Sequence, residues 1–333
     1  MYAAPHALSK RSRATCCFQS WYNVRGYGLA DTQNAMIYHD YAPFYDGSGQ
    51  LRFAVLSGQY IRELLVRHPV SGRCALDLAC GTGTLALLLA GDGWDVIGLD
   101  SSAAMLDQAD AKAENMATPG HVVFVQGDMR GLTTNDERPM TKYHRSQIDT
   151  LSSSVLRPSS FNLVTCVYDS LNYLLDEREL AACFESAARV LAPRGLLVAD
   201  MNTHYFLEHD WGTCEVIEQA GLVQVTQSYF DPAAACSTMV LSGFAGDDQR
   251  GYTRFDETHI ERAYAPEVVE RLLYSAGLEV EALYECFTFQ PITERTQRFA
   301  WVARKPGLRT EDLVTSAAAL SPQHSAHMRG VHR

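Results

Sequence analysis

Three aspartates follow or interrupt apolar runs at similar places in the first half of the chain. Asp77 lies inside the run 75–80, Asp100 ends the segment 95–100, and Asp128 follows the run 122–125. If these runs are parallel strands, their carboxyl ends meet at one edge of a sheet. Carboxylates at that edge can accept hydrogen bonds from ribose hydroxyls or from an amino group. The spacing therefore predicts a nucleoside-binding pocket.

A small-residue turn stands between the first run and a leucine-rich segment. Gly81 and Gly83 permit backbone conformations and close approach that a Cβ would block. From Thr84 onward a helix begins, and its first N–H groups are free and point at the turn. Residues 81–86 also fit the G-x-G-x-x-A pattern of dinucleotide sites. The turn alone therefore leaves the kind of nucleoside open.

Asp128 separates the two kinds of site. Asp100 can accept both ribose hydroxyls in an NAD site or in a site for S-adenosyl-L-methionine. Asp128 stands where a carboxylate can accept from an adenine amino group while Met105 or Met129 packs on the ring. A dinucleotide site does not require that third acid, so the set favours S-adenosyl-L-methionine.

With these residues, the span from about 41 to 305 resembles the class I S-adenosylmethionine-dependent methyltransferases of the small-molecule branch. The matching segments are 77–83, 98–102 with Met105 and Leu106, 127–130, 164–173 and 191–197. One departure is Ala79, where the family more often has a glycine; alanine is small, so we expect the site to survive. The cofactor residues that the resemblance implies are Tyr45, Asp77, Ala79, Gly81, Gly83, Asp100, Ser101, Met105, Asp128 and Met129.

Tyr45 belongs to a segment, 38–46, that resembles the family's lid before the first helix. An aromatic ring there can cover the methionine end of the cofactor. The alternative is that Tyr45 packs in the core.

Candidate residues for the acceptor side follow the fourth strand and lie near position 259. After the fourth strand stand Tyr168, Asp169 and Tyr173. His259 lies in an E-x-H pattern that resembles the cap of amino-sugar N-methyltransferases, where that histidine is near the acceptor. Histidine can accept a proton near neutral pH, although a single histidine on a strand is often structural.

The remaining pattern predicts the elements that position these residues. Apolar runs at 75–80, 96–99, 122–125, 163–167 and 196–199 lack strict alternation, as in parallel strands buried on both faces. Helices separate them, which predicts a doubly wound α/β, Rossmann-like sheet. The resemblance adds a seventh, antiparallel strand, which we place at 298–304. Residues 204–262 predict a small antiparallel β cap inserted after the fifth strand, alternatively a decorative hairpin or a dimer contact.

The domain organisation follows from composition. A methyltransferase domain is expected at 38–305, with a mobile insertion at 132–160, rich in serine, threonine and charge. Residues 1–37 predict a disordered tail or a targeting segment, since the first 30 positions have no acidic residue, and a start at Met36 is a further alternative. Residues 306–333 predict a disordered tail.

Charge and cysteine content narrow the function. The 333-residue chain is 47% hydrophobic, with a net charge of −11, which disfavours a broad nucleic-acid surface. No run reaches the length of a membrane span. Nine cysteines without C-x-x-C pairs favour reduced thiols and a cytoplasmic location. No metal site is expected, and a homodimer is possible.

These observations predict a methyltransferase that moves a methyl group to a nitrogen or oxygen of a small-molecule acceptor. The sequence after the fourth strand, Tyr168-Asp-Ser-Leu, has neither the N-P-P-Y type motif nor the Pro-Cys of DNA methyltransferases. Two alternatives stay open: an NAD(P)-dependent oxidoreductase on a similar sheet, and a non-catalytic binding subunit of methyltransferase type.

Overall fold

Strands and helices alternate from α2 to β3 and again from β4 to β5, as the sequence predicts. The computed structural model describes residues 37–132, 159, 161–212, 214–219 and 221–307. The predicted insertion at 132–160 and the two predicted tails lie almost entirely outside these ranges. The helices are α2 (Leu51–Arg67), α3 (Thr84–Gly91), α4 (Ala103–Ala113), α6 (Glu177–Val190), α7 (His204–His209) and α8 (Pro266–Ser275), with short turns η2 (Ala42–Phe44), η3 (Asp46–Gln50), η4 (Met129–Gly131) and η5 (Ser170–Tyr173).

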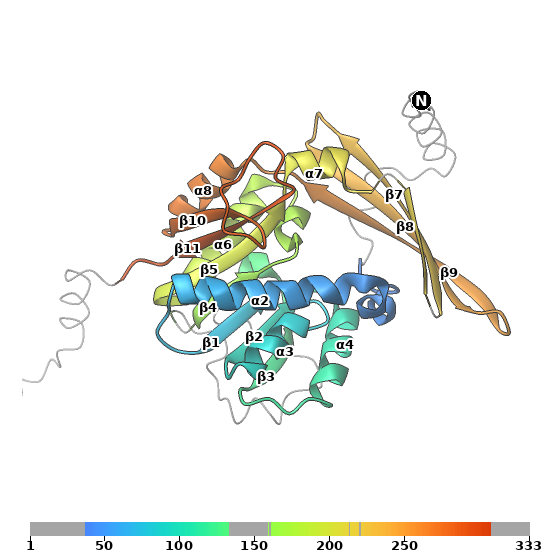
Figure 1. The fold of residues 1–333 in the computed structure, drawn as a ribbon, viewed down its shortest axis with the longest axis horizontal. Helices are drawn as coiled ribbons and strands as arrows, with labels where there is room; N and C mark the ends of the chain where they lie inside the picture. The colour runs from blue at the N-terminus through green and yellow to red at the C-terminus, as the bar shows by residue number, and fades with distance from the viewer. Residues whose placement is uncertain (1–36, 133–158, 160, 213, 220, 308–333) are drawn as a thin grey trace, which may run out of the picture.

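A seven-stranded sheet forms the body of the molecule (Figure 1). Its strands are β1 (Cys74–Leu78), β2 (Asp95–Asp100), β3 (Val122–Gln126), β4 (Phe161–Cys166), β5 (Leu191–Asn202), β10 (Glu279–Glu285) and β11 (Arg298–Arg304). The order is β3-β2-β1-β4-β5-β11-β10, with β1 to β5 parallel and β11 antiparallel to both neighbours. The predicted Rossmann-like sheet with a seventh, antiparallel strand at 298–304 is confirmed.

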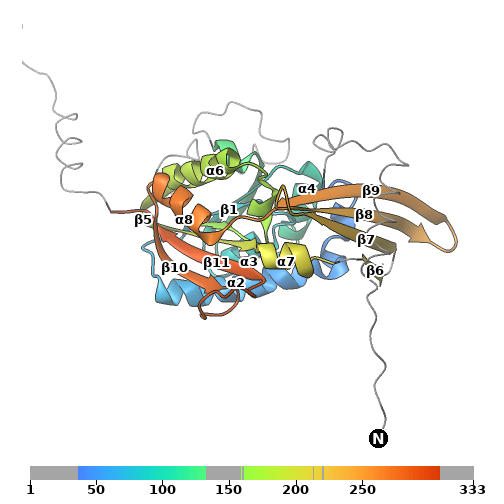
Figure 2. The same ribbon diagram turned by 90° about the horizontal axis from the view of Figure 1, so that it is seen from above.

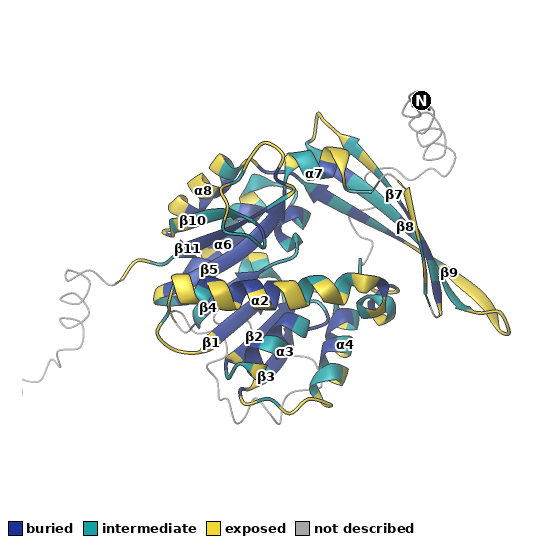
Figure 3. Cartoon of the chain, in the orientation of Figure 1, coloured by how far each residue is buried: buried dark blue, intermediate teal, exposed yellow. Residues whose placement is uncertain are grey.

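Helices cover both faces of this sheet (Figure 2). Phe184 of α6 packs with Trp301 on one face, in a cluster that also takes in α8. Ile61 and Leu64 of α2 pack with α3 and α4 on the other face. Figure 3 shows the strands between these layers as buried along most of their length. Burial on both faces explains why these runs lack polar alternation.

Local signals place the helix ends. The Asp176 side chain accepts from the Arg178 N–H and caps α6, as predicted. Pro266 opens α8, and Gly277 follows its end at φ +80°. No helix within the described ranges is long and apolar enough to cross a membrane.

A second, four-stranded antiparallel sheet stands between β5 and α8 and forms the predicted cap. Its strands are β6 (Cys214–Gln219), β7 (Leu222–Asp231), β8 (Cys236–Asp247) and β9 (Gly251–Arg262), in that order. Figure 1 shows it extending away from the seven-stranded sheet. Strand β6 was not predicted, because its residues do not alternate regularly between apolar and polar and most of them are exposed. Cross-strand pairing puts Met239 opposite His259 and Ser237 opposite Glu261, so these residues share one face.

The turn after β1 depends on glycine at position 83. Gly83 has φ +74°, and a Cβ there would lie 2.4 Å from the Phe124 ring and 2.8 Å from the Ala109 Cβ. The backbone conformation and the close packing of α4 and β3 both exclude a side chain.

We therefore expect Gly83→Ala to lower the free energy of unfolding by about 2–4 kcal/mol, the sum of backbone strain and overpacking. Gly93→Ala is the matched control, because Gly93 also has positive φ (+82°) but no atom lies within 4 Å of its added Cβ. It should lose only about 1 kcal/mol. Equilibrium urea unfolding measures both values, and equal losses would contradict the packing argument.

Candidate functional site

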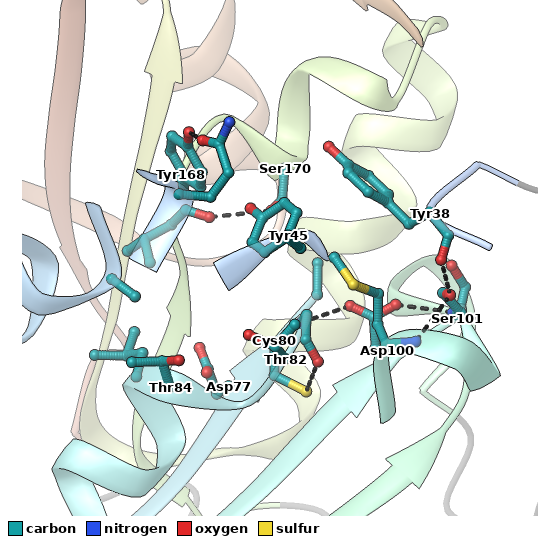
Figure 4. A pocket seen from close by; sticks show the side chains of 18 of the residues that line it. Tyr38, Tyr45, Asp77, Cys80, Thr82, Thr84, Asp100, Ser101, Tyr168 and Ser170 are labelled. Carbon is teal, nitrogen blue, oxygen red and sulfur yellow. Dashed lines mark hydrogen bonds between the residues drawn. The ribbon is translucent and has the colours of Figure 1, made fainter. Parts of the chain in front are cut away.

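A pocket opens at the carboxyl ends of β1 and β2, against the turn that follows β1 (Figure 4). We call it the turn pocket. Eight of the ten residues predicted to bind a cofactor line it: Tyr45, Asp77, Ala79, Gly81, Asp100, Ser101, Met105 and Met129. Ala79 keeps positive φ (+52°) although it is not glycine, and Gly81 has φ +55°. The turn thus keeps its left-handed conformation despite the alanine.

Asp100 holds this turn together. The Gly81 N–H donates to its Oδ2 and the Ser102 N–H to its Oδ1, each at 2.8 Å. The carboxyl is 9% exposed, and burial raises its pKa although the backbone N–H groups lower it. Asp100 therefore joins the end of β2 to the glycine turn while it faces the pocket.

Asp77 leaves one buried oxygen without a partner. Thr165 Oγ1 donates to Oδ1 at 2.6 Å, whereas Oδ2 has no hydrogen-bond partner among the described residues. Burial raises the pKa of this carboxyl to about 7; the Thr165 contact lowers it and the charge of Asp100 raises it further. A buried, pocket-lining acceptor of this kind suits a ligand that brings a hydrogen-bond donor, and a cationic donor most of all.

The other two predicted residues do not line the turn pocket. Gly83 packs under α4 and β3, so its role in the structure is to shape the turn. Asp128 accepts from the backbone N–H and the guanidinium of Arg130, and Arg130 also bridges to Glu179. The sequence did not indicate that pairing. Contact of Asp128 with an adenine ring stays a prediction.

The predicted lid lies over the turn pocket. We define the lid as residues 37–50, which include η2 and η3. Its Asp46 accepts from Thr82 Oγ1 (2.7 Å) and from Lys112 Nζ (2.7 Å), and Lys112 also donates to Thr84 Oγ1 (2.7 Å). These contacts fasten the lid to the glycine turn. Tyr45 lines the pocket from the lid, and its contact with the methionine end of a cofactor stays a prediction.

The segment after β4 forms the wall on the other side. Tyr168 and Asp169 both have positive φ (61° and 53°), and their N–H groups donate to the two oxygens of Asp200, each at 2.9 Å. Arg298 Nη1 donates to both Asp169 (2.9 Å) and Asp200 (2.8 Å). The Tyr168 ring stacks on Phe53 of α2 at 4.6 Å. This strained turn is therefore fixed from β5, β11 and α2.

A second pocket lies between this wall and the cap, and we call it the cap pocket. Its cap side is the inner face of β6 to β9: Glu215, Ile217, Gln224, Thr226, Met239, Leu241, His259 and Glu261. The residues that line both pockets are Tyr38, Tyr45, Gln50, Tyr168 and Tyr173. These five side chains border both pockets. A molecule bound in the turn pocket would therefore lie next to a molecule bound in the cap pocket.

All four predicted catalytic residues line the cap pocket. His259, 4% exposed, has its Nδ1 3.1 Å from the Tyr173 hydroxyl, which lies 2.7 Å from the Tyr38 hydroxyl. Tyr168 and Asp169 complete the set from the segment after β4. The structure thus brings the four residues together from two separate parts of the chain.

The charged groups that line the cap pocket are acidic. They are Asp169, Glu215 and Glu261, and no lysine or arginine is among the described residues of this lining. Asn202 Nδ2 donates to Asp169 (3.0 Å) and to Glu261 (2.8 Å). Burial, and then the negative charge of Asp169, raise the pKa of Glu261 well above its usual range. A positively charged guest would offset the charges of Asp169 and Glu215 and lower the pKa of Glu261, so the pocket favours such a guest.

Several site residues were missed from the sequence. Glu257 is the glutamate of the E-x-H pattern but was given no role of its own, and Glu261 was not singled out. Both flank His259 at two-residue spacing, and that alternation on one strand was the signal that could have found them. Gln224, 3% exposed, lines the cap pocket with its Oε1 unpartnered in the described chain. No sequence signal marked it.

Burial of Asp77 predicts a pH dependence of stability for the ligand-free protein. Its folded pKa of about 7 exceeds the usual 3.8, so the stability it contributes is present below pH 4 and is lost as pH rises through 7. Between these limits the loss is about 3–4 kcal/mol. Asp77→Asn should remove it, so the variant should gain stability relative to the wild type from pH 5 to pH 8.

Urea unfolding at the two pH values measures this difference. Asp107→Asn, at an exposed position of α4, is the control and should leave the pH dependence unchanged. If Asp77→Asn and the wild type lose the same stability between pH 5 and pH 8, Asp77 is not the buried titrating group.

Comparisons with known proteins agree with this geometry. Residues 75–140 match a methyltransferase domain family. A Geobacillus sp. (strain WCH70) protein, named putative methyltransferase GWCH70_2453, is 31% identical over 231 residues, 69% of this chain and 83% of that relative. The dTDP-3-amino-3,6-dideoxy-alpha-D-glucopyranose N,N-dimethyltransferase of Streptomyces fradiae is 27% identical over 66% of this chain and 76% of its own length.

Among solved structures, a S-adenosylmethionine-dependent methyltransferase from Clostridium acetobutylicum ATCC 824 superimposes with a TM-score of 0.65 and 25% identity, over 80% of this chain and 98% of that chain. The two pockets, the fold and these relatives lead to one assignment. The chain belongs to the class I S-adenosylmethionine-dependent methyltransferases.

Proposed function

We propose that this protein transfers a methyl group from S-adenosyl-L-methionine to the amine nitrogen of a small molecule bound in the cap pocket. The proposal rests on one observation: two pockets lie next to each other and share part of their lining. One is built around a glycine turn with two buried aspartates, and the other has only acidic charges in its described lining.

The turn pocket suits the cofactor on chemical grounds. Asp100 offers carboxylate lone pairs beside a turn whose backbone lies open to the pocket, which is the arrangement that receives ribose hydroxyls. The unpartnered Oδ2 of Asp77 suits an ammonium group. Met105 and Met129 supply apolar surface for a purine ring. We therefore assign the ribose to Asp100 and the methionine end to the side near Asp77.

An amine acceptor follows from the charges of the cap pocket. A protonated amine is attracted by Asp169 and Glu215, and its charge would favour ionisation of Glu261, whose pKa is raised by burial. A carboxylate or phosphate group would be repelled. Arg298, the guanidinium next to this wall, is held by Asp169 and Asp200. The Streptomyces fradiae relative is by its name an N,N-dimethyltransferase of an amino sugar, which supports the same chemistry here.

The reaction asks little of the protein beyond alignment, exclusion of water and removal of one proton. When bound, the cofactor supplies a methyl group on an electrophilic sulfonium. A protonated amine has no lone pair, so it must first give one N–H proton to a base. The neutral nitrogen could then form the N–C bond while the electron pair of the S–C bond goes to sulfur. His259, hydrogen bonded through Nδ1 to Tyr173, is the group that we assign to accept this proton.

Matched acceptors test the proposed function. Purified full-length protein with methyl-labelled cofactor should methylate hydroxylated small amines and leave unlabelled the alcohols that carry oxygen in place of the nitrogen. Mass spectrometry of the product locates the methyl group. Labelling of the alcohols alone would overturn the assignment of nitrogen as the acceptor atom, and no binding of the cofactor would overturn the function itself.

His259→Ala should lower turnover of the best amine by about 10²–10⁴-fold, the range for a positioned base. Affinity for the cofactor should stay nearly unchanged, because the cap pocket holds His259 and the turn pocket does not include it. His121→Ala, an exposed histidine before β3, is the matched control. Full activity of the His259 variant would transfer the role to Tyr168, Asp169 or Tyr173.

A further inference from the structure

The first turn of the lid wraps around one carboxylate of the cap. Four consecutive backbone N–H groups donate to Glu257 of β9: Tyr38 to Oε2 at 2.8 Å, and His39, Asp40 and Tyr41 to Oε1 at 3.1, 3.1 and 3.0 Å. Consecutive N–H groups that converge in this way form an anion-binding concavity. Glu257 is 5% exposed, so the contact is a buried one.

The same carboxylate stands beside His259. Glu257 Oε2, which accepts from the Tyr38 N–H, lies 3.4 Å from His259 Nε2. On its other side, His259 contacts the Tyr173 hydroxyl, and that hydroxyl contacts Tyr38. Glu257, His259, Tyr173 and Tyr38 therefore form a ring of contacts that joins the cap, the lid and the segment after β4. Although burial raises the pKa of Glu257, His259 and the lid N–H groups hold it below its usual range.

Both ends of the lid are also fastened beside the turn pocket. At the far end, Asp46 accepts from Thr82 of the glycine turn and from Lys112 of α4. At the near end, the Tyr38 carbonyl accepts from Oγ of Ser102, the N-cap of α4, at 2.9 Å. The lid thus joins the cap to the glycine turn and α4. Its side chains Tyr38 and Tyr45 line both pockets.

We propose that Glu257 is a positioning residue. Its one carboxylate binds the lid backbone at 38–41 and also lies beside Nε2 of His259. It therefore couples closure of the lid over the turn pocket to the orientation of the acceptor-side histidine. The role of His259 rests on the proposed function; the hold on the lid does not. A glutamine at position 257 would keep the shape but would offer one accepting oxygen instead of two, and no charge.

Amide hydrogen exchange of the full-length chain, read by mass spectrometry, tests this hold directly. In Glu257→Gln, peptides covering 37–45 should exchange about 10- to 100-fold faster than in the wild type, as expected for lost hydrogen bonds to a charged group. Asp256→Asn is the matched control, because Asp256 is an exposed acid one residue earlier on β9 that contacts Ser242 and Arg254. It should leave the lid peptides unchanged.

Each result decides the inference. Faster exchange confined to the lid supports it. Unchanged lid exchange overturns it, and so does faster exchange throughout β7 to β9, since Glu257 would then serve the cap fold rather than the lid.

Kinetics separate a positioning role from a merely structural one. S-adenosylhomocysteine, bound to Glu257→Gln, should dissociate about tenfold faster by stopped flow, and Glu257→Asp, which keeps the charge, should recover part of the loss. If S-adenosylhomocysteine does not bind the wild type at all, the proposed function fails while the exchange experiment still decides the hold on the lid. An unchanged dissociation rate with a loosened lid would contradict the coupling of Glu257 to the turn pocket.

Discussion

The site depends on how Asp200 fixes the turn after β4. Two successive residues there, Tyr168 and Asp169, adopt positive φ, a conformation that costs about 1–2 kcal/mol per non-glycine residue. Asp200 receives both of their N–H groups, and Arg298 offsets its charge. Without this carboxylate the turn would relax, and the side chains that separate the two pockets would lose their places.

Arg298 shows how the fold supports the chemistry. Its guanidinium is 12% exposed and contacts two carboxylates, Asp169 and Asp200, while Glu261 lies on the same network through Asn202. Burying such a group of charges is costly and is weak support for stability alone. Its effect here is on the site: acidic groups outnumber the cation around the cap pocket. The acidic groups would compensate a cationic substrate for the hydration that it loses when it enters the pocket.

Local sequence patterns predicted most of the fold. The strand at 298–304, the cap on α6 by Asp176 and the glycine turn each follow from residues close in sequence or from a family resemblance. Strand β6 was not predicted because its residues do not alternate regularly, and its pairing with β7 is a contact that the local pattern does not show. Eight of the ten residues predicted to bind the cofactor line the turn pocket, because strand ends and turns place them there.

The contacts that join distant segments could not be predicted. Glu257 and the lid lie more than 200 residues apart, and the pairing involves backbone N–H groups, which carry no sequence signal. Asp128 shows a related case: its position after β3 is the expected one, but its contact with Arg130, two residues on, was not indicated by the sequence. Its contact with an adenine ring stays a prediction.

A crystal structure with S-adenosylhomocysteine bound would show whether the turn pocket holds the donor. We expect ribose hydroxyls within hydrogen-bonding distance of Asp100 and the sulfur directed toward the tyrosines shared by the two pockets, Tyr38, Tyr45, Tyr168 and Tyr173. A ligand bound elsewhere, or a sulfur directed away from the cap pocket, would contradict the assignment of the two pockets to donor and acceptor.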